Sequence, residues 1–229
     1  MACSSIVPVM ALVSGNGTNL AALIGAEQAG RLGPASIRVV VSDRAGAYAL
    51  TRAKNARIEA LVELPRRELP RDERRRELSE RILARARERD IGLIVLAGFL
   101  SILTREITGA YAGRIINLHP SLLPQFGGEG MYGEHVHRAV IASGERESGC
   151  TVHFVDEGID RGPIILQRKV PVLAGDSPES LAERIHREEH AALAEAVSLV
   201  APRLAREAGA EPPGGTIPPR PARPRGGKS

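Results

Sequence analysis

The chain has 229 residues, enough for one domain that buries a substantial core without disulfides or a structural metal. Its only cysteines, Cys3 and Cys150, exclude a disulfide framework and favour a reducing, cytoplasmic location. No apolar run reaches the roughly 18 residues of a membrane span. The apolar stretch 6–13 lacks the basic flank and cleavage site of a signal peptide, so we expect neither a membrane anchor nor a leader.

The formal net charge of +4 belongs to the C-terminal stretch. The residues from Arg203 onward carry six basic and two acidic side chains, so residues 1–201 are balanced. A neutral globular part gives no reason to expect a nucleic-acid partner. We therefore predict a folded domain over residues 1–204 and a disordered tail, rich in Pro, Gly and Arg, over residues 205–229.

Short apolar runs alternate with amphipathic segments through the first half of the chain. Runs rich in Val, Ile and Leu predict strands at 6–13, 37–42, 58–63, 93–98 and 114–119. Helical patterns lie between them at 18–30, 45–56 and 71–90, the last with a solvated face of Arg and Glu. Nearly continuous apolar strands followed by helices predict an α/β fold with a parallel sheet covered by helices on both faces.

The pattern changes after Pro124. A glycine-rich loop at 125–133 is followed by a helix at 134–144. Two strands, at 150–158 and 163–172, flank a short link, and a long final helix spans 177–204. Two strands around a short link favour an antiparallel or mixed extension of the sheet. Ser177, followed by Pro178, reads as the N-cap of the final helix.

A glycine-rich turn, SGNGTNL, joins the first strand to the first helix. At such a turn the backbone N–H groups and the helix dipole favour an anion, and Gly15 and Gly17 let the backbone come close to it. The turn does not match the Walker A pattern, because no Gly-Lys-Ser/Thr follows. It does not match the dinucleotide fingerprint either, because Leu20 stands where that pattern needs a third glycine. A single phosphate is the favoured ligand, and a tight turn without a ligand remains the alternative.

The stretch GRIINLHPSLLP places Asn117 and His119 at alternate positions of one strand, just before Pro120. Both side chains should point to the same side. An amide can donate to a developing oxyanion, and a histidine can move a proton near neutral pH. Asp160, on the glycine-flanked link, would orient His119 and favour its protonated form if the two meet. A core histidine and a turn-forming aspartate are the alternatives.

Two histidine pairs resemble metal motifs. His186, Glu189 and His190 spell an inverted zinc-protease pattern, but no third ligand is evident in the sequence. The pair His135 and His137 is equally well explained as an exposed helix start. We therefore expect no metal.

Four motifs in this order, SGNGTNL, VLAGFLSIL, NLHPSLLP and VDEGIDRGPI, resemble the phosphoribosylglycinamide formyltransferase family. The resemblance covers about residues 6–200. It implies a Rossmann-like formyltransferase fold. It also implies transfer of a formyl group from the co-substrate 10-formyltetrahydrofolate to the amine of phosphoribosylglycinamide in purine synthesis. A monomer or a homodimer acting on small molecules, without a metal, is expected.

The resemblance also implies roles for individual residues. The catalytic positions are Asn117, His119 and Asp160. The phosphate and ribose would be bound by Gly15, Asn16, Gly17, Thr18, Asn19 and Glu189. The folate would be bound by Phe99, Leu100, Ser101, Ile102, Leu103, Asn117, Asp156, Glu157 and Gly158, together with an arginine that is either Arg71 or, as we prefer, Arg75.

Three other functions compete with this interpretation. Formyltetrahydrofolate deformylase shares the Asn-x-His and Asp motifs, but typically has an N-terminal regulatory domain and a histidine where this chain has Pro120. Methionyl-tRNA formyltransferase needs a C-terminal tRNA-binding domain, which residues 211–229 do not supply. A non-catalytic phosphosugar- or folate-binding module would not need Asn117, His119 and Asp160 together.

Overall fold

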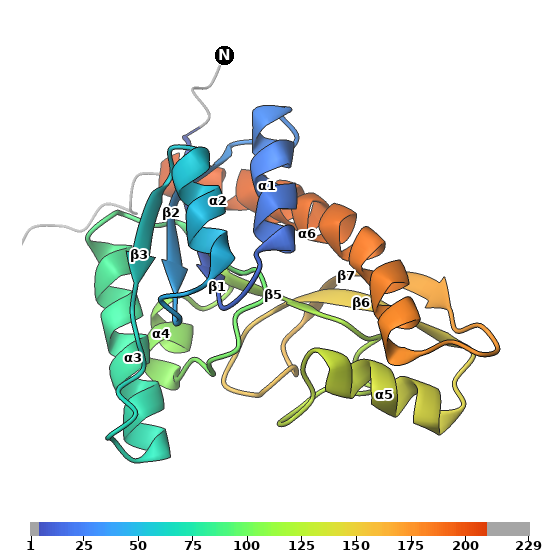
Figure 1. Ribbon diagram of the computed structural model, residues 1–229. Coiled ribbons are helices and arrows are strands. Elements are labelled where there is room, and N and C mark those ends of the chain that lie inside the picture. Colours follow the sequence, from blue (N-terminus) through green and yellow to red (C-terminus); the bar gives the residue numbers. More distant parts are fainter. Residues whose placement is uncertain (1–4, 210–229) are drawn as a thin grey trace, which may run out of the picture.

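The computed structural model describes residues 5–209, which build one seven-stranded sheet with helices on both faces (Figure 1). The strand order is β3-β2-β1-β4-β5-β6-β7, with β1 to β5 parallel and β6 and β7 antiparallel. The strands are β1 (Val7–Val13), β2 (Ala35–Ser42), β3 (Glu59–Val62), β4 (Leu93–Leu96), β5 (Ile115–His119), β6 (Glu147–Phe154) and β7 (Ile164–Pro171). The predicted Rossmann-like fold with an antiparallel extension is confirmed.

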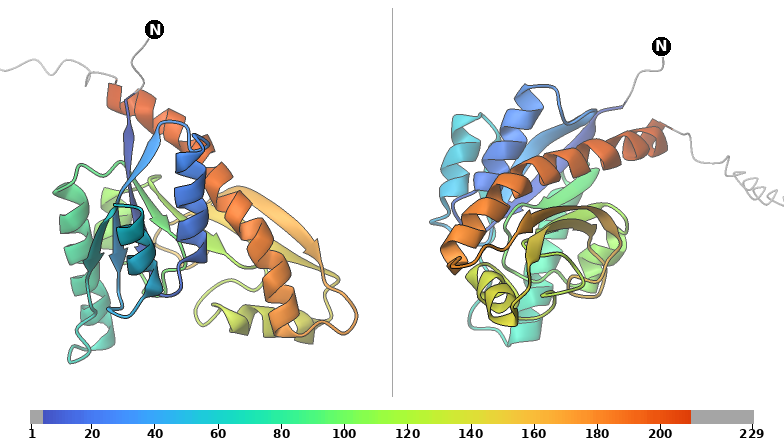
Figure 2. Two further views of the ribbon diagram at one scale, coloured as in Figure 1. Left: turned by 45° about the horizontal axis from the view of Figure 1, so that its top comes forward. Right: turned by 90° about the vertical axis from the view of Figure 1, so that its right-hand side faces the viewer.

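The helices form two layers, seen from two further directions in Figure 2. The helices are α1 (Thr18–Gln28), α2 (Tyr48–Asn55), α3 (Arg71–Arg87), α4 (Arg105–Ala110), α5 (Glu134–Ser143) and α6 (Pro178–Gly209). Buried residues of α1, α2, α5 and α6 share one core cluster with one face of the sheet. Buried residues of α3 and α4 share a second cluster with the other face. Among the described residues no helix is long and apolar enough to cross a membrane.

The alternation of side chains along the strands explains the two layers. In β1, Val9 and Ala11 belong to the cluster under α1 and α6, whereas Met10 and Leu12 belong to the cluster under α3. All four side chains are buried. A strand covered on both faces needs apolar residues at every position, which is why these runs lack the polar alternation of a half-exposed strand.

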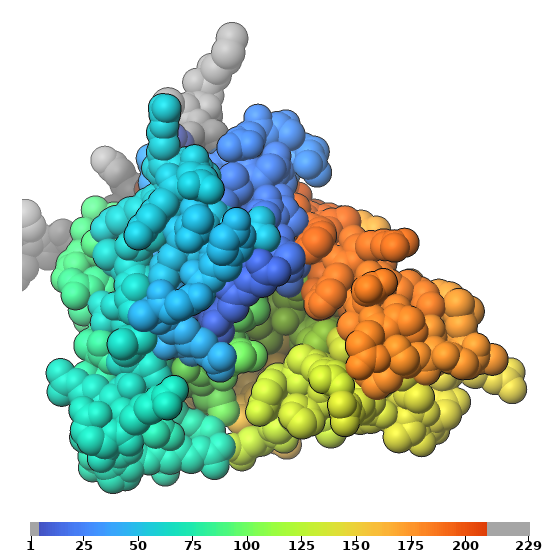
Figure 3. All heavy atoms as spheres, in the orientation of Figure 1, coloured from blue at the N-terminus to red at the C-terminus, as the bar shows by residue number. Residues whose placement is uncertain are grey.

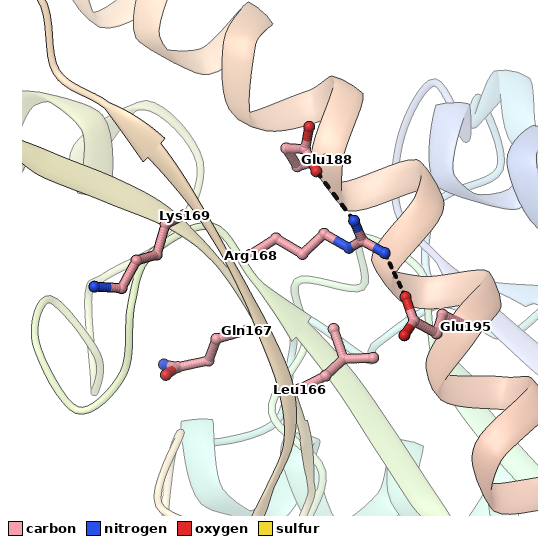
Figure 4. Close-up of a pocket in the computed structure, with 6 residues that line it drawn as sticks. All are labelled: Leu166, Gln167, Arg168, Lys169, Glu188 and Glu195. Atoms are coloured by element: carbon pink, nitrogen blue, oxygen red, sulfur yellow. Dashed lines mark hydrogen bonds and ion pairs between the residues drawn. The ribbon is translucent and has the colours of Figure 1, made fainter.

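The antiparallel extension is tied to α6 by ion pairs. Figure 4 shows Arg168 of β7 reaching across to Glu188 and Glu195 of α6. The neighbouring Gln167 turns to the opposite face of the sheet. There its amide nitrogen donates to the Leu123 carbonyl at 3.0 Å and to Thr151 Oγ1 at 2.9 Å. Gln167 therefore anchors the segment that directly follows the functional strand β5.

Two helices differ from the prediction. Helix α4 was not predicted, because its six residues are too few to show a helical period. Helix α6 continues to Gly209, five residues beyond the predicted end of the helix and of the folded domain at 204. The helix continues because Ala205 packs into the core, and Arg203 pairs with Glu207 one turn later. The remainder of the predicted tail, 210–229, lies outside the described residues.

The predicted N-cap of α6 is present. The Ser180 backbone N–H donates to Ser177 Oγ at 3.2 Å, and the Leu181 N–H donates to the Ser177 carbonyl at 3.1 Å. We expect Ser177→Ala to lower the free energy of unfolding by about 1 kcal/mol, because it removes the cap acceptor. Urea denaturation measures this loss. Ser177→Asp keeps an acceptor and should stay close to wild type; equal losses in both variants would contradict the capping role.

Candidate active site

A cleft with a volume of about 960 Å³ opens at the carboxyl ends of the parallel strands. It lies beside the junction of β1 and β4, where the strand order reverses direction. In open α/β sheets this switch point is the usual place for a ligand. Figure 3 shows the surface hollowed between the teal segment of α3 and the yellow-green segment of the 125–133 loop and α5.

Asn117 and His119 reach the cleft from the last residues of β5. Their side chains lie on the same side of the strand, as predicted. His119 Nδ1 lies 3.4 Å from Asp160 Oδ2, so the predicted contact between these residues is present. The other ring nitrogen, Nε2, donates to the Phe126 carbonyl oxygen at 2.8 Å. His119 is thus held between the 156–160 link and the 125–133 loop.

Both residues that hold His119 have an unusual backbone. Phe126 has φ of 54° and Asp160 has φ of 55°, in the left-handed region that non-glycine residues rarely adopt. Such conformations persist where the surroundings fix them, and they gather at functional sites. Here the Gly128 N–H donates to Asp160 Oδ2 at 3.0 Å, which joins the loop to the link.

Burial lowers the pKa of His119, although the charge of Asp160 opposes the shift. His119 is only 3% exposed, so the loss of water around an imidazolium outweighs the single carboxylate. Asp160 thus favours the protonated form, as expected, but it does not lift the His119 pKa above its ordinary value. The imidazole starts neutral, as a proton acceptor would.

Asp160 itself stays ionised. Burial raises the pKa of its carboxyl, but the ring of His153, the charge of His119 and the Gly128 N–H together hold the pKa below its usual range. A buried carboxylate beside a neutral histidine is poised to stabilise that histidine once it takes up a proton.

His153 is a site residue that the sequence analysis missed. It lies opposite Asn117 in the antiparallel pairing of β5 with β6. Its Nδ1 donates to the Phe154 carbonyl at 2.9 Å, so in the neutral ring Nε2 accepts from Asn117 Nδ2 at 3.2 Å. This bond fixes the Asn117 amide with its second N–H free. Only the strand register could have revealed the pair.

The glycine turn lies at the start of α1. The helix begins without a side-chain cap, so the N–H groups of its first turn remain free for an anion. Of the predicted phosphate residues, only Asn19 and Glu189 line the cleft itself. Gly15, Asn16, Gly17 and Thr18 form the adjoining turn at its rim.

The two glycines of this turn have different roles. Gly17 has φ of 75°, and a Cβ there would stand 2.5 Å from Ala49 Cβ of α2. Gly15 has no atom within 4 Å of the position that a Cβ would take. Gly17 is therefore required by packing against α2, and only Gly15 faces open space where a ligand could approach.

Arg52 of α2 braces the turn from outside. Its guanidinium donates to the Asn16 carbonyl at 2.9 Å and to Asn16 Oδ1 at 3.1 Å, and it stacks over the Tyr48 ring. The Ala49 N–H also donates to the Gly15 carbonyl at 3.1 Å. No sequence pattern signals this role, because Arg52 lies 36 residues beyond its partner.

Glu189 organises the other side of the turn. This buried carboxylate accepts from Asn19 Nδ2 at 3.3 Å and from His186 Nδ1 at 2.7 Å. His186 and Glu189 are therefore hydrogen-bonded to each other. Within residues 5–209, no group of three His, Cys, Asp or Glu side chains is arranged so that it could hold a metal ion. His137, predicted at an exposed helix start, is instead buried at the cleft with Nδ1 unpartnered.

The predicted folate residues form the opposite part of the cleft. All of residues 99–103 and 156–158 line it, and so do Arg71 and Arg75, between which the sequence could not decide. Leu100 is 46% exposed and its N–H donates to Ser14 Oγ at 2.8 Å, which ties this wall to β1. Ser101 Oγ donates to Asp43 Oδ2 at 2.7 Å. An apolar wall with such polar anchors suits a flat heteroaromatic ligand.

The fold and the arrangement of the cleft define a protein of the formyl-transfer class. Residues 7–197 match the family described as "Formyl transferase", and the chain belongs to that family.

Among its relatives, phosphoribosylglycinamide formyltransferase of Escherichia coli K12 is 40% identical over 183 residues, which are 80% of this chain and 82% of that protein. The chain is also 44% identical over 198 residues to the trifunctional purine biosynthetic protein adenosine-3 of Drosophila pseudoobscura pseudoobscura. That match spans 84% of this chain but only 14% of the longer protein. The crystal structure of glycinamide ribonucleotide transformylase 1 from Symbiobacterium toebii superposes with a TM-score of 0.78 at 40% identity, covering 86% of this chain and 88% of that one.

Proposed function

We propose that this chain transfers a formyl group from 10-formyltetrahydrofolate to the amine of phosphoribosylglycinamide. The observation that carries the proposal is the place of Asn117, His119 and Asp160, between the glycine turn and the 99–103 wall of one cleft. The names of the relatives that match over most of the chain support the same reaction.

The two ligands would enter the cleft from opposite ends. The phosphate would lie on the N–H groups at the start of α1, with Asn19 and Glu189 directed toward the ribose. The folate would lie against residues 99–103 and 156–158. The amine and the formyl carbon then meet at the end of β5, and holding them there removes much of the entropic barrier to reaction.

In the first step the amine nitrogen attacks the formyl carbon. A C–N bond forms, and the carbonyl π electrons move to oxygen. The free N–H of Asn117 stabilises this oxyanion. Once the Phe126 carbonyl leaves Nε2 of His119, the ring proton moves to Nδ1 against Asp160, and Nε2 takes the proton that the amine nitrogen loses. Asp160 stabilises the resulting imidazolium.

In the second step the tetrahedral intermediate collapses. The C=O bond re-forms, the bond from carbon to the folate nitrogen breaks, and the imidazolium of His119 gives its proton to that nitrogen. The products are the formylated amide and tetrahydrofolate, and His119 returns to its neutral form.

A product assay separates this function from its rivals. The purified chain is mixed with 10-formyltetrahydrofolate, with and without phosphoribosylglycinamide, and the release of tetrahydrofolate is followed. Release that requires the amine supports the proposal. Equal release without the amine would make the chain a deformylase, and no release in either case would make it a binding module.

We expect Asp160→Asn to be more harmful at neutral pH than at low pH. The Asp160 charge raises the pKa of His119, so the variant should lower that pKa further and shift the acid limb of kcat/KM to lower pH. The introduced amide oxygen can still accept from the Gly128 N–H, which preserves the loop contact. The pH profiles of both proteins measure this shift; an equal loss at every pH would assign Asp160 a purely structural role.

The proposal also covers the partners, the oligomeric state and the location of the enzyme. Its ligands are small molecules, with neither nucleic acid nor membrane as a partner, and it acts as a monomer or homodimer in the cytoplasm. Burial raises the pKa of the Cys150 thiol to about 12, which leaves this buried, unpaired thiol unreactive.

A further inference from the structure

His137 of α5 is a buried polar side chain of the cleft to which the steps of formyl transfer give no role. It lines the cleft although it is only 2% exposed, and its Nδ1 is enclosed without a hydrogen-bond partner in residues 5–209. Val136 and Val140 of the same helix belong to the apolar core. Burying an imidazole without a partner destabilises a fold, so such a residue beside a cleft indicates a partner that arrives with the ligand.

The protonation of the His137 ring decides what it offers to a ligand. Burial lowers the pKa of His137, although the charge of Glu189 opposes the shift, so the ring is neutral at neutral pH and carries one N–H. A proton on Nδ1 would be a buried donor without an acceptor, whereas Nε2, at the tip of the ring, is not enclosed in this way. The proton therefore belongs on Nε2, and His137 presents one neutral N–H donor to the cleft.

The surroundings of His137 lie between the ribose end of the cleft and the reacting centre. The charges of Glu189 and His186 of α6 act on the ring, and so does that of His119 at the end of β5. Helix α5 packs against α6 (Figure 1), which is the helix that carries the carboxylate directed toward the ribose. In the proposed orientation of the substrate, the group between the ribose and the attacking amine is an amide, whose carbonyl oxygen accepts a hydrogen bond.

Glu189 leaves this carbonyl to another residue. Its two hydrogen bonds, from Asn19 and His186, both end on Oε2, so Oε1 can accept from a ribose hydroxyl. A carboxylate and a carbonyl oxygen are both acceptors, so Glu189 cannot bind the amide carbonyl. The neutral N–H of His137 supplies the donor that this carbonyl requires.

We propose that His137 determines specificity for the glycinamide by donating its Nε2–H to the amide carbonyl oxygen. The inference rests on the proposed function, because phosphoribosylglycinamide supplies that carbonyl. A single methylene group joins the attacking amine to the carbonyl carbon, so fixing the carbonyl restricts the positions that the amine can take beside His119. A site that hydrogen-bonds one oxygen of its substrate discriminates against analogues that lack this oxygen, because its own donor is then left unpaired.

Three substitutions of His137 test which ring nitrogen acts. The amide nitrogen of glutamine reaches about as far from the backbone as Nε2, whereas that of asparagine reaches only about as far as Nδ1. We expect His137→Gln to keep kcat/KM within about threefold of wild type, and His137→Asn and His137→Leu to lower it about tenfold, the scale of one hydrogen bond. KM for the folate should stay unchanged in all three. The matched control is His135→Leu, because His135 is exposed on the same helix and does not line the cleft.

Binding of substrate analogues in the absence of folate tests the contact itself. Titration calorimetry compares two carbocyclic ligands, in which CH₂ replaces the ring oxygen so that the side chain does not hydrolyse. One carries the glycinamide, and the other carries its thioamide, whose sulfur accepts hydrogen bonds weakly. We expect the wild type and His137→Gln to bind the thioamide about fivefold more weakly, and His137→Asn and His137→Leu to bind both ligands equally. Thermal unfolding checks that each variant is folded.

The outcomes separate this inference from the proposed function. Equal binding of both ligands by the wild type, or a thioamide penalty that persists in His137→Leu, would overturn the contact while leaving the formyl transfer intact. Equal losses of kcat/KM in His137→Gln and His137→Asn would overturn it too. So would a penalty for a 3′-deoxy analogue that disappears in His137→Leu, since this would assign the ring to the ribose. If the wild-type chain binds neither carbocyclic ligand, the proposed function fails and the inference fails with it.

Discussion

Replacing His119 by alanine is expected to lower kcat about 10²- to 10⁴-fold, the usual contribution of a positioned acid–base group. His119 contacts both the 125–133 loop and Asp160 at the end of β5, where the two ligands would meet. Asn117→Ala should lower kcat about 10²- to 10³-fold, because it removes one donor to the oxyanion. Steady-state kinetics of the purified variants, with both substrates saturating, measure these losses.

The controls must separate chemistry from folding. His135→Ala removes an exposed histidine of α5 that does not line the cleft, so its kcat should stay close to wild type. Thermal unfolding of all three variants checks that the fold persists. Near-normal turnover in a folded His119→Ala protein would exclude His119 as the proton carrier.

The second large effect concerns Gly15 and Gly17 of the glycine turn. Replacing each of them should impair the protein in a different way. Gly17→Ala adds a Cβ 2.5 Å from Ala49 Cβ, on a residue with φ of 75°. We expect it to cost about 2–4 kcal/mol of folding free energy through overpacking and backbone strain. Gly15→Ala meets no atom of the protein within 4 Å, so its stability should be nearly unchanged.

Gly15→Ala should instead weaken the binding of the phosphoribosyl substrate. Its methyl group would stand where the phosphate approaches the N–H groups of α1, and losing one charge-assisted hydrogen bond raises KM roughly tenfold. The contact exists in the ground and transition states alike, so kcat should change less than kcat/KM. Denaturation curves and the two Michaelis constants test the pair. A raised KM for folate with an unchanged KM for the phosphoribosyl substrate would reverse the orientation of the ligands in the cleft.

The sequence predicted the sheet because its strands are buried on both faces. Runs such as IVPVMALV contain only residues that suit a doubly covered strand, and their order with helices leaves few topologies. The alternation of Asn117 and His119 was equally readable, because the period of a strand is two. The end of α6 could not be read from the sequence, because Ala205 and Gly209 add little to a helical pattern of apolar residues. The packing of Ala205 into the core keeps the helix intact there.

The parts of the site that escaped prediction depend on contacts between distant segments. The bond from Asn117 to His153 follows from the register of β5 on β6, which no local pattern encodes. The direction of the shift in the His119 pKa depends on whether burial of the ring outweighs the charge of Asp160. The need for glycine at position 17 comes from Ala49 in the next helix. Sequence patterns placed Asn117 and His119 on one strand whose end lines the cleft, and the packing determines the electrostatics around them.

The fate of a labelled formyl group distinguishes transfer to the amine from hydrolysis. 10-Formyltetrahydrofolate carrying ¹³C in its formyl group is incubated with phosphoribosylglycinamide and the chain, and the label is followed by ¹³C NMR. We expect the label to appear as a formamide carbon bonded to the substrate nitrogen, in equal amount to the tetrahydrofolate formed, and His119→Ala to abolish this signal on the same timescale. Label that accumulates as free formate, at a rate independent of phosphoribosylglycinamide, would show that the chain does not transfer the formyl group to this amine.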